Sequence, residues 1–247
     1  MTVAVIVQAR LGSTRLPGKV LRQLGEATVL AHVLTRCRAI PGADVVCCAI
    51  PESPENDPVA DEAARCGVEV FRGPEDDVLA RYDGAARQVS AEVVMRVTSD
   101  CPMIDPLVCG AVLNLLTDAD YACNNMPPSW PHGLDCEAMR YEWLARAADE
   151  ATSKAEREHV TPFIRDHPEA RKANLDGPGG VDHRWTLDNA RDWDFLEQIW
   201  RCLPDGEAAW DYRVALAIVE ADPELAAING GQDRHEGLKK RLAEGCQ

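Results

Sequence analysis

The segment from Val3 to Lys19, VAVIVQARLGSTRLPGK, decides the fold and shows where to look for a functional site. Its first half is an apolar run, which is typical of a strand that is buried on both faces of a parallel sheet. Its second half carries Arg10, Arg15 and Lys19 together with two glycines. Ligands of open α/β sheets bind outside the carboxyl ends of the strands, so this basic loop stands where an anionic ligand would be held.

Beyond this segment, short apolar runs alternate with helix-length stretches, which predicts a mostly parallel sheet with helices on both faces. We expect strands at 3–9, 44–50, 68–71, 92–97, 134–139 and 183–187, and helices at 28–39, 57–66, 78–89, 105–116, 141–151, 155–166 and through the tail. We interpret 1–247 as a single domain. Its parts are a nucleotide-binding half (1–122), an acceptor and dimerisation portion (123–182), and a returning strand with C-terminal helices (183–247).

Composition excludes several classes of protein. A net charge of −15 argues against a nucleic-acid-binding protein, because phosphate backbones require a basic face. No apolar run reaches the ~18–20 residues of a membrane span, and the amino terminus lacks the pattern of a signal peptide. The ten cysteines contain no CxxC pair, and several lie in apolar stretches. They therefore predict buried, reduced thiols and a cytoplasmic protein.

The loop after the first strand is positively charged, whereas the chain as a whole is acidic. The first 25 residues contain no acidic residue and four cations, Arg10, Arg15, Lys19 and Arg22. Gly12 and Gly18 allow the backbone to approach a ligand closely. Arginine can grip phosphate oxygens with two nitrogens, and lysine supplies a point charge. The alternative is a solvated turn whose cations pair with surface acids.

Two aspartates are candidates for metal ligands. Asp100 and Asp188 each follow an apolar run, so we expect both at strand ends that face the basic loop. Magnesium typically takes one or two protein carboxylates together with phosphate oxygens and water, which predicts Mg²⁺ as the cofactor. The alternative for each aspartate is a helix cap, and a cap is the interpretation that we favour for Asp105, which precedes Pro106.

The motif QARxxSTRLPGK at 8–19 resembles the signature loop of the cytidylyltransferases that activate acidic sugars, including the acylneuraminate and 3-deoxy-manno-octulosonate types. The spore-coat polysaccharide biosynthesis protein F group is the most similar branch. Further matches are DVLARY at 77–82, RVTSDCPMIDP at 96–106, GLDCE at 133–137, EREHVTP at 156–162 and RWTLD at 184–188. The resemblance covers roughly residues 3–200 and implies a Rossmann-like nucleotidyltransferase fold of the GT-A-like type.

The same resemblance implies an activity and a set of site residues. CMP would pass from CTP to a small anionic acceptor in a homodimeric enzyme. The implied catalytic residues are Arg10, Arg15, Lys19, Asp100 and Asp188, and the last two would bind the metal. The implied nucleotide site adds Gly12, Ser13, Asp77, Arg81 and Arg96, and the implied acceptor site contains His132, Asp135, Glu137, Arg157 and His159. Ser99 departs from the Gly or Ala expected before the first aspartate. Three alternatives stay open: another nucleotide as donor, a glycosyltransferase of similar fold, and a catalytically silent nucleotide-binding module.

Overall fold

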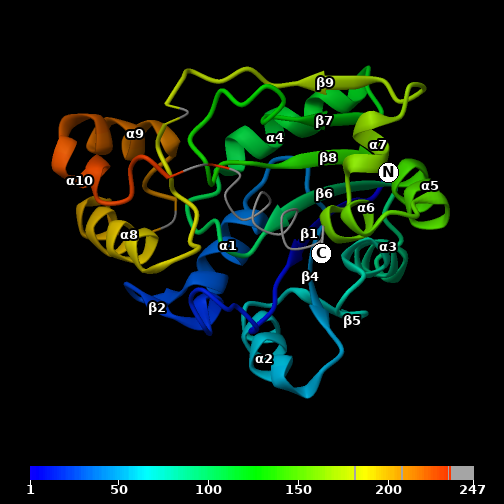
Figure 1. Ribbon diagram of the computed structural model, residues 1–247, viewed down its shortest axis with the longest axis horizontal. Coiled ribbons are helices and arrows are strands. Elements are labelled where there is room, and N and C mark those ends of the chain that lie inside the picture. Colours follow the sequence, from blue (N-terminus) through cyan, green and yellow to red (C-terminus); the bar gives the residue numbers. More distant parts are fainter. Residues whose placement is uncertain (181, 207, 233, 235–247) are drawn as a thin grey trace, which may run out of the picture.

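A computed structural model describes residues 1–180, 182–206, 208–232 and 234. Within these residues, seven strands form one sheet in the order β5-β4-β1-β6-β8-β7-β9 (Figure 1). The strands are β1 (Val3–Gln8), β4 (Val45–Pro51), β5 (Glu69–Gly73), β6 (Val93–Thr98), β7 (Tyr121–Cys123), β8 (Glu137–Arg140) and β9 (Lys172–Asn174). A separate small hairpin pairs β2 (Gln23–Leu24) with β3 (Ala27–Thr28).

The sheet is mostly parallel, as expected. β1 is an interior strand that runs parallel to both of its neighbours, β4 and β6, and β5 extends this parallel block beyond β4. β8 reverses direction and runs antiparallel to β6 and β7, while β9 runs parallel to β7. The carboxyl ends of the parallel strands therefore meet at one edge, where the chain leaves β1 into the basic loop. The predicted α/β class is confirmed.

Helices cover both faces of the sheet. One apolar core contains side chains of α1 (Val29–Arg38), α2 (Asp57–Arg65) and α4 (Pro106–Asn114). The core on the other face contains α3 (Val78–Gln88), α5 (Tyr141–Glu150) and side chains from the region of the short helices α6 (Lys154–His159) and α7 (Pro162–Asp166). Short 3₁₀ turns are η1 (Lys19–Leu21), η2 (Pro54–Asn56) and η3 (Leu115–Thr117). Alternating strand residues face the two cores, which gives the sheet its two buried faces.

Three helices form a separate group beside the sheet, which we name the helical cap: α8 (Ala190–Cys202), α9 (Tyr212–Ala221) and α10 (Pro223–Ala227). Figure 1 shows them together at one end of the molecule. They share a third apolar core that includes four tryptophans, Trp130, Trp185, Trp193 and Trp210. In the part of the chain that the structure describes, no helix combines the length and apolar character that a membrane span requires.

The prediction of a strand at 183–187 is wrong, and so is the prediction that this segment rejoins the sheet. The segment makes only an isolated bridge, between His132 and Arg184. Trp185 N–H donates to His132 C=O, and Leu187 N–H donates to Asp100 C=O, so the segment is held by two loops instead of a strand. Gly133 permits this approach, because a Cβ there would lie 2.7 Å from the Trp185 carbonyl carbon. The strand that extends the sheet is β9, which our sequence analysis missed together with β7.

The helix expected at 155–166 is two helices, because the chain turns sharply at Val160. Val160 has φ 71° and ψ −54°, a conformation that a β-branched residue rarely adopts. Thr161 N–H donates to His159 C=O at 2.8 Å, which closes a γ-turn. The turn aims the Thr161 hydroxyl at Glu137, 2.7 Å away. The helices predicted for the tail are present as α8, α9 and α10. Residues 235–247 lie outside the described part of the chain.

Candidate active site

The basic loop and the two candidate metal ligands meet at the carboxyl ends of β1 and β6. Lys19 begins η1 directly after Gly18, whose left-handed backbone (φ 67°) turns the loop back toward the sheet. Asp100 lies two residues beyond the end of β6. Asp188 lies at the end of the extended segment that our sequence analysis mistook for a strand. Residues 100 and 188 are therefore neighbours in space although 88 positions separate them.

The Lys19 ammonium joins the two aspartates. Its Nζ donates to Asp100 Oδ2 at 2.8 Å, to Asp188 Oδ1 at 3.1 Å and to the Leu187 carbonyl at 2.6 Å. The Lys19 side chain is only 13% exposed, so these are charge-assisted bonds in a largely dry environment. Arg15 reaches the same Asp188 oxygen at 3.2 Å from a more exposed position.

The electrostatics of this contact favour full ionisation of both partners. Burial alone would lower the pKa of Lys19, but the carboxylates of Asp100 and Asp188 outweigh it and hold that pKa above its ordinary value. Burial alone would raise the pKa of Asp100, but the Lys19 ammonium reverses this effect and holds that pKa well below its usual range. Asp100 is therefore an anion throughout the physiological pH range, as a metal ligand must be.

Asp188 is not a helix cap. The N-cap of α8 is Asn189, whose side chain accepts from Arg191 N–H and Asp192 N–H. The Asp188 side chain instead receives Arg184 Nη2 on Oδ2 at 2.8 Å, which leaves Oδ1 facing Lys19. The capping alternative thus fails for Asp188. It holds for Asp105, which caps α4 through Leu107 N–H and Val108 N–H, as the sequence predicted.

The pair of aspartates suits a divalent cation that also binds substrate. Among the described residues, no group of three or more His, Cys, Asp or Glu side chains is arranged to hold a metal ion. A site with two carboxylates is nevertheless what Mg²⁺ uses when phosphate oxygens and water complete its octahedron. The Lys19 ammonium indicates where such a cation would bind, because its nitrogen lies between Asp100 and Asp188 and donates to an oxygen of each.

Four further predicted nucleotide residues lie in the loop after β1 or in the first turn of α3. Arg10 and Gly12 are exposed in the loop after β1, and Ser13 Oγ accepts from Leu16 N–H within it. Arg81 is 2% exposed and donates to the carbonyls of Pro74 and Glu75, which fixes the loop before α3. Burial, with Arg10 adding to it, lowers the pKa of Arg81 below its ordinary value.

Asp77 and Arg157, which we predicted for different substrates, bind each other. Asp77 caps α3 by accepting from Ala80 N–H. Its other oxygen accepts from Arg157 Nε at 2.6 Å, and Arg157 also donates to the carbonyls of Ala148 and Ala151. The pair ties α6 to the start of α3. His159 lies in the last turn of α6, two residues after Arg157.

Glu137 and Arg96 form another ion pair, which is largely buried on the α3 face of the sheet. Arg96 Nη1 donates to Glu137 Oε2 at 2.6 Å, and the other Glu137 oxygen accepts from the hydroxyls of Tyr121 and Thr161. Glu137 is 4% exposed. Its oxygens are thus engaged inside the protein, although we predicted that it would face acceptor hydroxyls.

His132 and Asp135 lie beside Arg184, next to the two aspartates. His132 Nδ1 accepts from Arg184 Nη1 at 3.2 Å, so the neutral imidazole carries its proton on Nε2, 4.0 Å from Asp135 Oδ2. Burial lowers the pKa of His132; Asp135 opposes this effect, and Arg234 and Arg184 add to it. Arg234 donates to Asp135 Oδ1 at 2.5 Å and to the Trp130 carbonyl at 2.9 Å.

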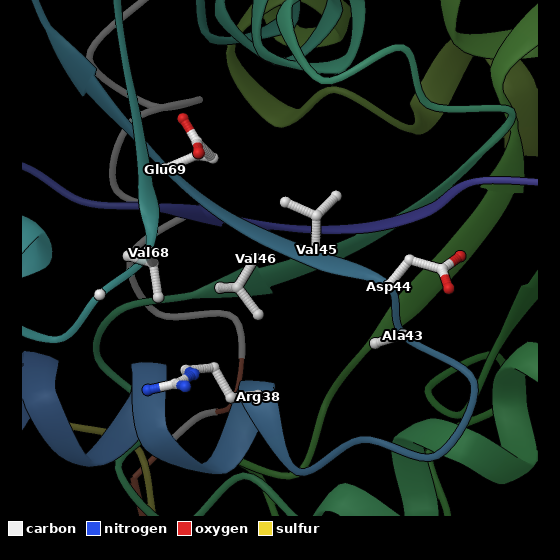
Figure 2. Close-up of a pocket in the computed structure, with 8 residues that line it drawn as sticks. Arg38, Ala43, Asp44, Val45, Val46, Val68 and Glu69 are labelled. Carbon is white, nitrogen blue, oxygen red and sulfur yellow. The ribbon is translucent and has the colours of Figure 1, made fainter.

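A cavity of about 270 Å³ lies at the opposite edge of the sheet, where β4 and β5 begin. Figure 2 shows Arg38, Asp44 and Glu69 around it, with valine side chains between them. It lies away from the carboxyl ends of the strands, where ligands of such sheets bind. We therefore place the candidate active site at the Lys19–Asp100–Asp188 contact.

Sequence reasoning missed several residues of this site. Arg184 and Asp192 stand four positions before and after Asp188, a spacing that could have suggested contact around a helix start. Arg234 and Asn229 carry no comparable signal, because they approach the site only through the path of the chain after the helical cap.

Comparison with known proteins decides the family. The model of the cytidylyltransferase family matches residues 4–200. The chain belongs to this family. Its activity is accordingly that of a nucleotidyltransferase, and the predicted family, fold class and enzyme class are confirmed.

Individual relatives agree with this assignment. The chain is 30% identical over 235 residues to the uncharacterized protein MJ1063 of Methanocaldococcus jannaschii, covering 93% of this chain and 95% of that protein. It is 29% identical to the spore coat polysaccharide biosynthesis protein SpsF of Bacillus subtilis, covering 81% and 86%. A 3-deoxy-manno-octulosonate cytidylyltransferase of Anaeromyxobacter is 34% identical over 46% of this chain and 47% of its own length. The solved cytidylyltransferase of Leptospira borgpetersenii superposes with a TM-score of 0.87 at 25% identity, covering 94% and 98%.

Proposed function

We propose that this cytidylyltransferase transfers CMP from CTP to an acidic sugar or another small anionic acceptor, with Mg²⁺ bound between Asp100 and Asp188. The observation that carries the proposal is the convergence of these aspartates on Lys19 Nζ, beside a loop that supplies Arg10 and Arg15. Its relatives include a protein of polysaccharide biosynthesis and a 3-deoxy-manno-octulosonate cytidylyltransferase, which supports a sugar acid as the acceptor.

In the proposed reaction, the acceptor hydroxyl attacks the α-phosphorus of CTP in line. A bond forms between the acceptor oxygen and the α-phosphorus, the bond from that phosphorus to the β-bridging oxygen breaks, and pyrophosphate and the hydroxyl proton are released. Bound Mg²⁺ would neutralise charge on the phosphate oxygens. Lys19 would leave the two carboxylates to the cation and turn its ammonium to the pyrophosphate, with Arg10 and Arg15 beside it. Positioning and electrostatics thus do most of the catalysis.

The acceptor would lie on the side of His132 and Asp135. Arg234, which pairs with Asp135 in this structure, would turn to an acceptor carboxylate, and Asp135 would then offer an oxygen to a sugar hydroxyl. A cytoplasmic homodimer is our expectation for the working enzyme, because the cysteine pattern of the sequence predicts a cytoplasmic protein and the family resemblance implies a homodimer. Arg157 and His159 stay candidates for the acceptor site, and Arg96 for the nucleotide site.

Pyrophosphate release tests the proposal. The protein is incubated with Mg²⁺, each of the four nucleoside triphosphates in turn, and a panel of sugar acids and phosphorylated acids. We expect pyrophosphate only with CTP and an acidic acceptor, together with a CMP-linked product by mass spectrometry. Pyrophosphate with another nucleotide would refute the choice of CTP. Binding of CTP without pyrophosphate from any acceptor would favour a silent binding module or a glycosyltransferase, which consumes a nucleotide sugar.

A further inference from the structure

Asp192 is the most highly bonded carboxylate at the site, although it faces neither the predicted triphosphate loop nor solvent. It is fully buried, and each of its oxygens accepts three donors. Oδ2 receives the Asp188 N–H at 2.9 Å, the Asn189 N–H at 3.1 Å and Arg184 Nη2 at 3.2 Å. Oδ1 receives Arg184 Nε at 2.8 Å, Asn229 Nδ2 at 3.1 Å and Gln232 Nε2 at 3.4 Å.

These bonds fix Asp188 in two ways. Asp192 holds the backbone N–H of Asp188 directly, and it holds the guanidinium of Arg184, which in turn donates to Asp188 Oδ2. Oδ1 of Asp188 is the oxygen left facing Lys19 and Asp100. The arrangement therefore offers a cation one oxygen of Asp188, in a fixed direction, and keeps the other on Arg184.

The chain after the helical cap completes this arrangement. Asn229 is 2% exposed and donates both to Asp192 and to the Arg184 carbonyl at 2.7 Å. Gln232 accepts from Asn189 Nδ2 at 2.7 Å while its own amide points at Asp192. Both residues lie beyond 4–200, the part of the chain that the family model matches.

We propose that Asp192, supported by Asn229 and Gln232, is a positioning residue that keeps Asp188 presenting a single oxygen to the divalent cation. The Asp192 charge is essential because the Arg184 side chain is only 7% exposed, and among the residues that the structure describes its guanidinium pairs with two carboxylates, those of Asp188 and Asp192. Without the Asp192 charge, Arg184 closes on both oxygens of Asp188 in the two-pronged geometry that arginine prefers with carboxylates. The metal then loses that ligand. The inference rests on the proposed metal site.

Direct metal binding tests the inference without turnover. Free Mn²⁺ is measured by electron paramagnetic resonance in mixtures of Mn²⁺, CTP and protein, with no acceptor present. Substitution of residues that orient metal ligands typically weakens metal affinity by about 10–100-fold. We expect a loss in this range for Asp192→Asn, and a smaller loss for Asn229→Ala, which removes one of the six donors. Arg191→Ala is the matched control, because the Arg191 side chain donates to the same chain segment at the Ile228 carbonyl, and no hydrogen bond found among the described residues joins that side chain to the Asp192 carboxylate.

A second variant separates orientation from simple structural damage. In Arg184→Gln/Asp192→Asn the competing cation is gone, so Asp188 regains its freedom to bind the metal, and we expect most of the lost Mn²⁺ affinity to return. Urea unfolding of every variant records stability independently. Parent-like affinity in a folded Asp192→Asn protein would overturn the inference, and so would a double variant that binds as weakly as the single one. If Asp192→Asn does not fold, Asn229→Ala tests the inference in its place. An unchanged Mn²⁺ affinity of Asn229→Ala would then overturn the inference.

The outcome is distinguishable from failure of the proposed function. A parent protein that does not bind Mn²⁺ with CTP would refute the metal site itself. If the parent binds and Asp100→Asn does not, the site stands, and the Asp192 variants then bear on positioning alone.

Discussion

Replacing Lys19 with methionine should destabilise the metal-free protein and make its stability depend on Mg²⁺. Lys19 Nζ lies 2.8 Å from Asp100 Oδ2 and 3.1 Å from Asp188 Oδ1, so these oxygens are no more than about 5.9 Å apart, the sum of the two distances. At an effective dielectric constant of about 20, two like charges at that separation repel by about 3 kcal/mol. Arg15 and Arg184 still face Asp188 in the variant and offset part of this repulsion. We expect a loss of about 2–3 kcal/mol in the free energy of unfolding.

Urea unfolding followed by tryptophan fluorescence measures this loss, once in EDTA and once in Mg²⁺. Magnesium should stabilise Lys19→Met more than the parent, because the cation takes the place of the missing ammonium. Arg15→Met is the matched control: Arg15 contacts the same Asp188 oxygen but is 38% exposed, and such a pair contributes about 0–1 kcal/mol. Equal stability of Lys19→Met and the parent in EDTA, with no greater response to Mg²⁺, would refute the reasoning.

The same variant has a defined pH dependence. Lys19 holds the pKa of Asp100 below its ordinary value of 3.8 in the folded protein. The ionised carboxylate therefore contributes stability above that ordinary pKa, and the contribution is lost as the pH falls toward the folded pKa. The difference in stability between parent and Lys19→Met should be widest near neutral pH and should narrow below about pH 4.

Three further predictions follow from the site. Asp100→Asn and Asp188→Asn should each lower kcat by orders of magnitude, and the double variant should lose little more, because both residues serve one ion; near-normal turnover of either variant in a pyrophosphate assay would contradict this. CTP with Mg²⁺ should raise the melting temperature more than ATP, GTP or UTP does, and an equal shift with all four would show phosphate binding without base selection. Glu137→Gln should lower the free energy of unfolding by about 3–5 kcal/mol, because it removes the carboxylate that pairs with the largely buried Arg96; a variant with parent-like stability in urea and a raised KM for the acceptor alone would return Glu137 to the acceptor site.

The sequence predicted the parallel half of the fold well because its strands carry a local signal. β1, β4 and β6 are largely apolar runs with both faces covered by helices, and a helix follows each of them in the chain. β7 and β9 are three residues long, too short for a pattern to show. The segment 183–187 has the composition of a buried strand and is buried, but its backbone bonds go to loops. Composition therefore predicts which segments are buried, but it does not predict which backbone groups form hydrogen bonds with each other.

The site was predictable to a similar degree and for the same reason. Lys19, Asp100 and Asp188 lie in contiguous motifs, so the resemblance located them, and the geometry brings them together. Pairing between distant side chains was not visible. The sequence therefore assigned Asp77 to the nucleotide and Arg157 to the acceptor, although they bond to each other. Asn229 and Arg234 were missed because their approach depends on the path of the chain around the helical cap.

The two candidate metal ligands are attached to different parts of the protein. Asp100 follows a strand in the middle of the sheet, whereas Asp188 is on the stretch of chain that leads directly into α8 of the helical cap. A rigid-body tilt of the cap would move one carboxylate and leave the other in place, and the coordination shell would open on one side. In the proposed site, the retention time of the cation, and of any phosphate product that it holds, would thereby be coupled to the stiffness of a helical group that contributes no strand to the sheet.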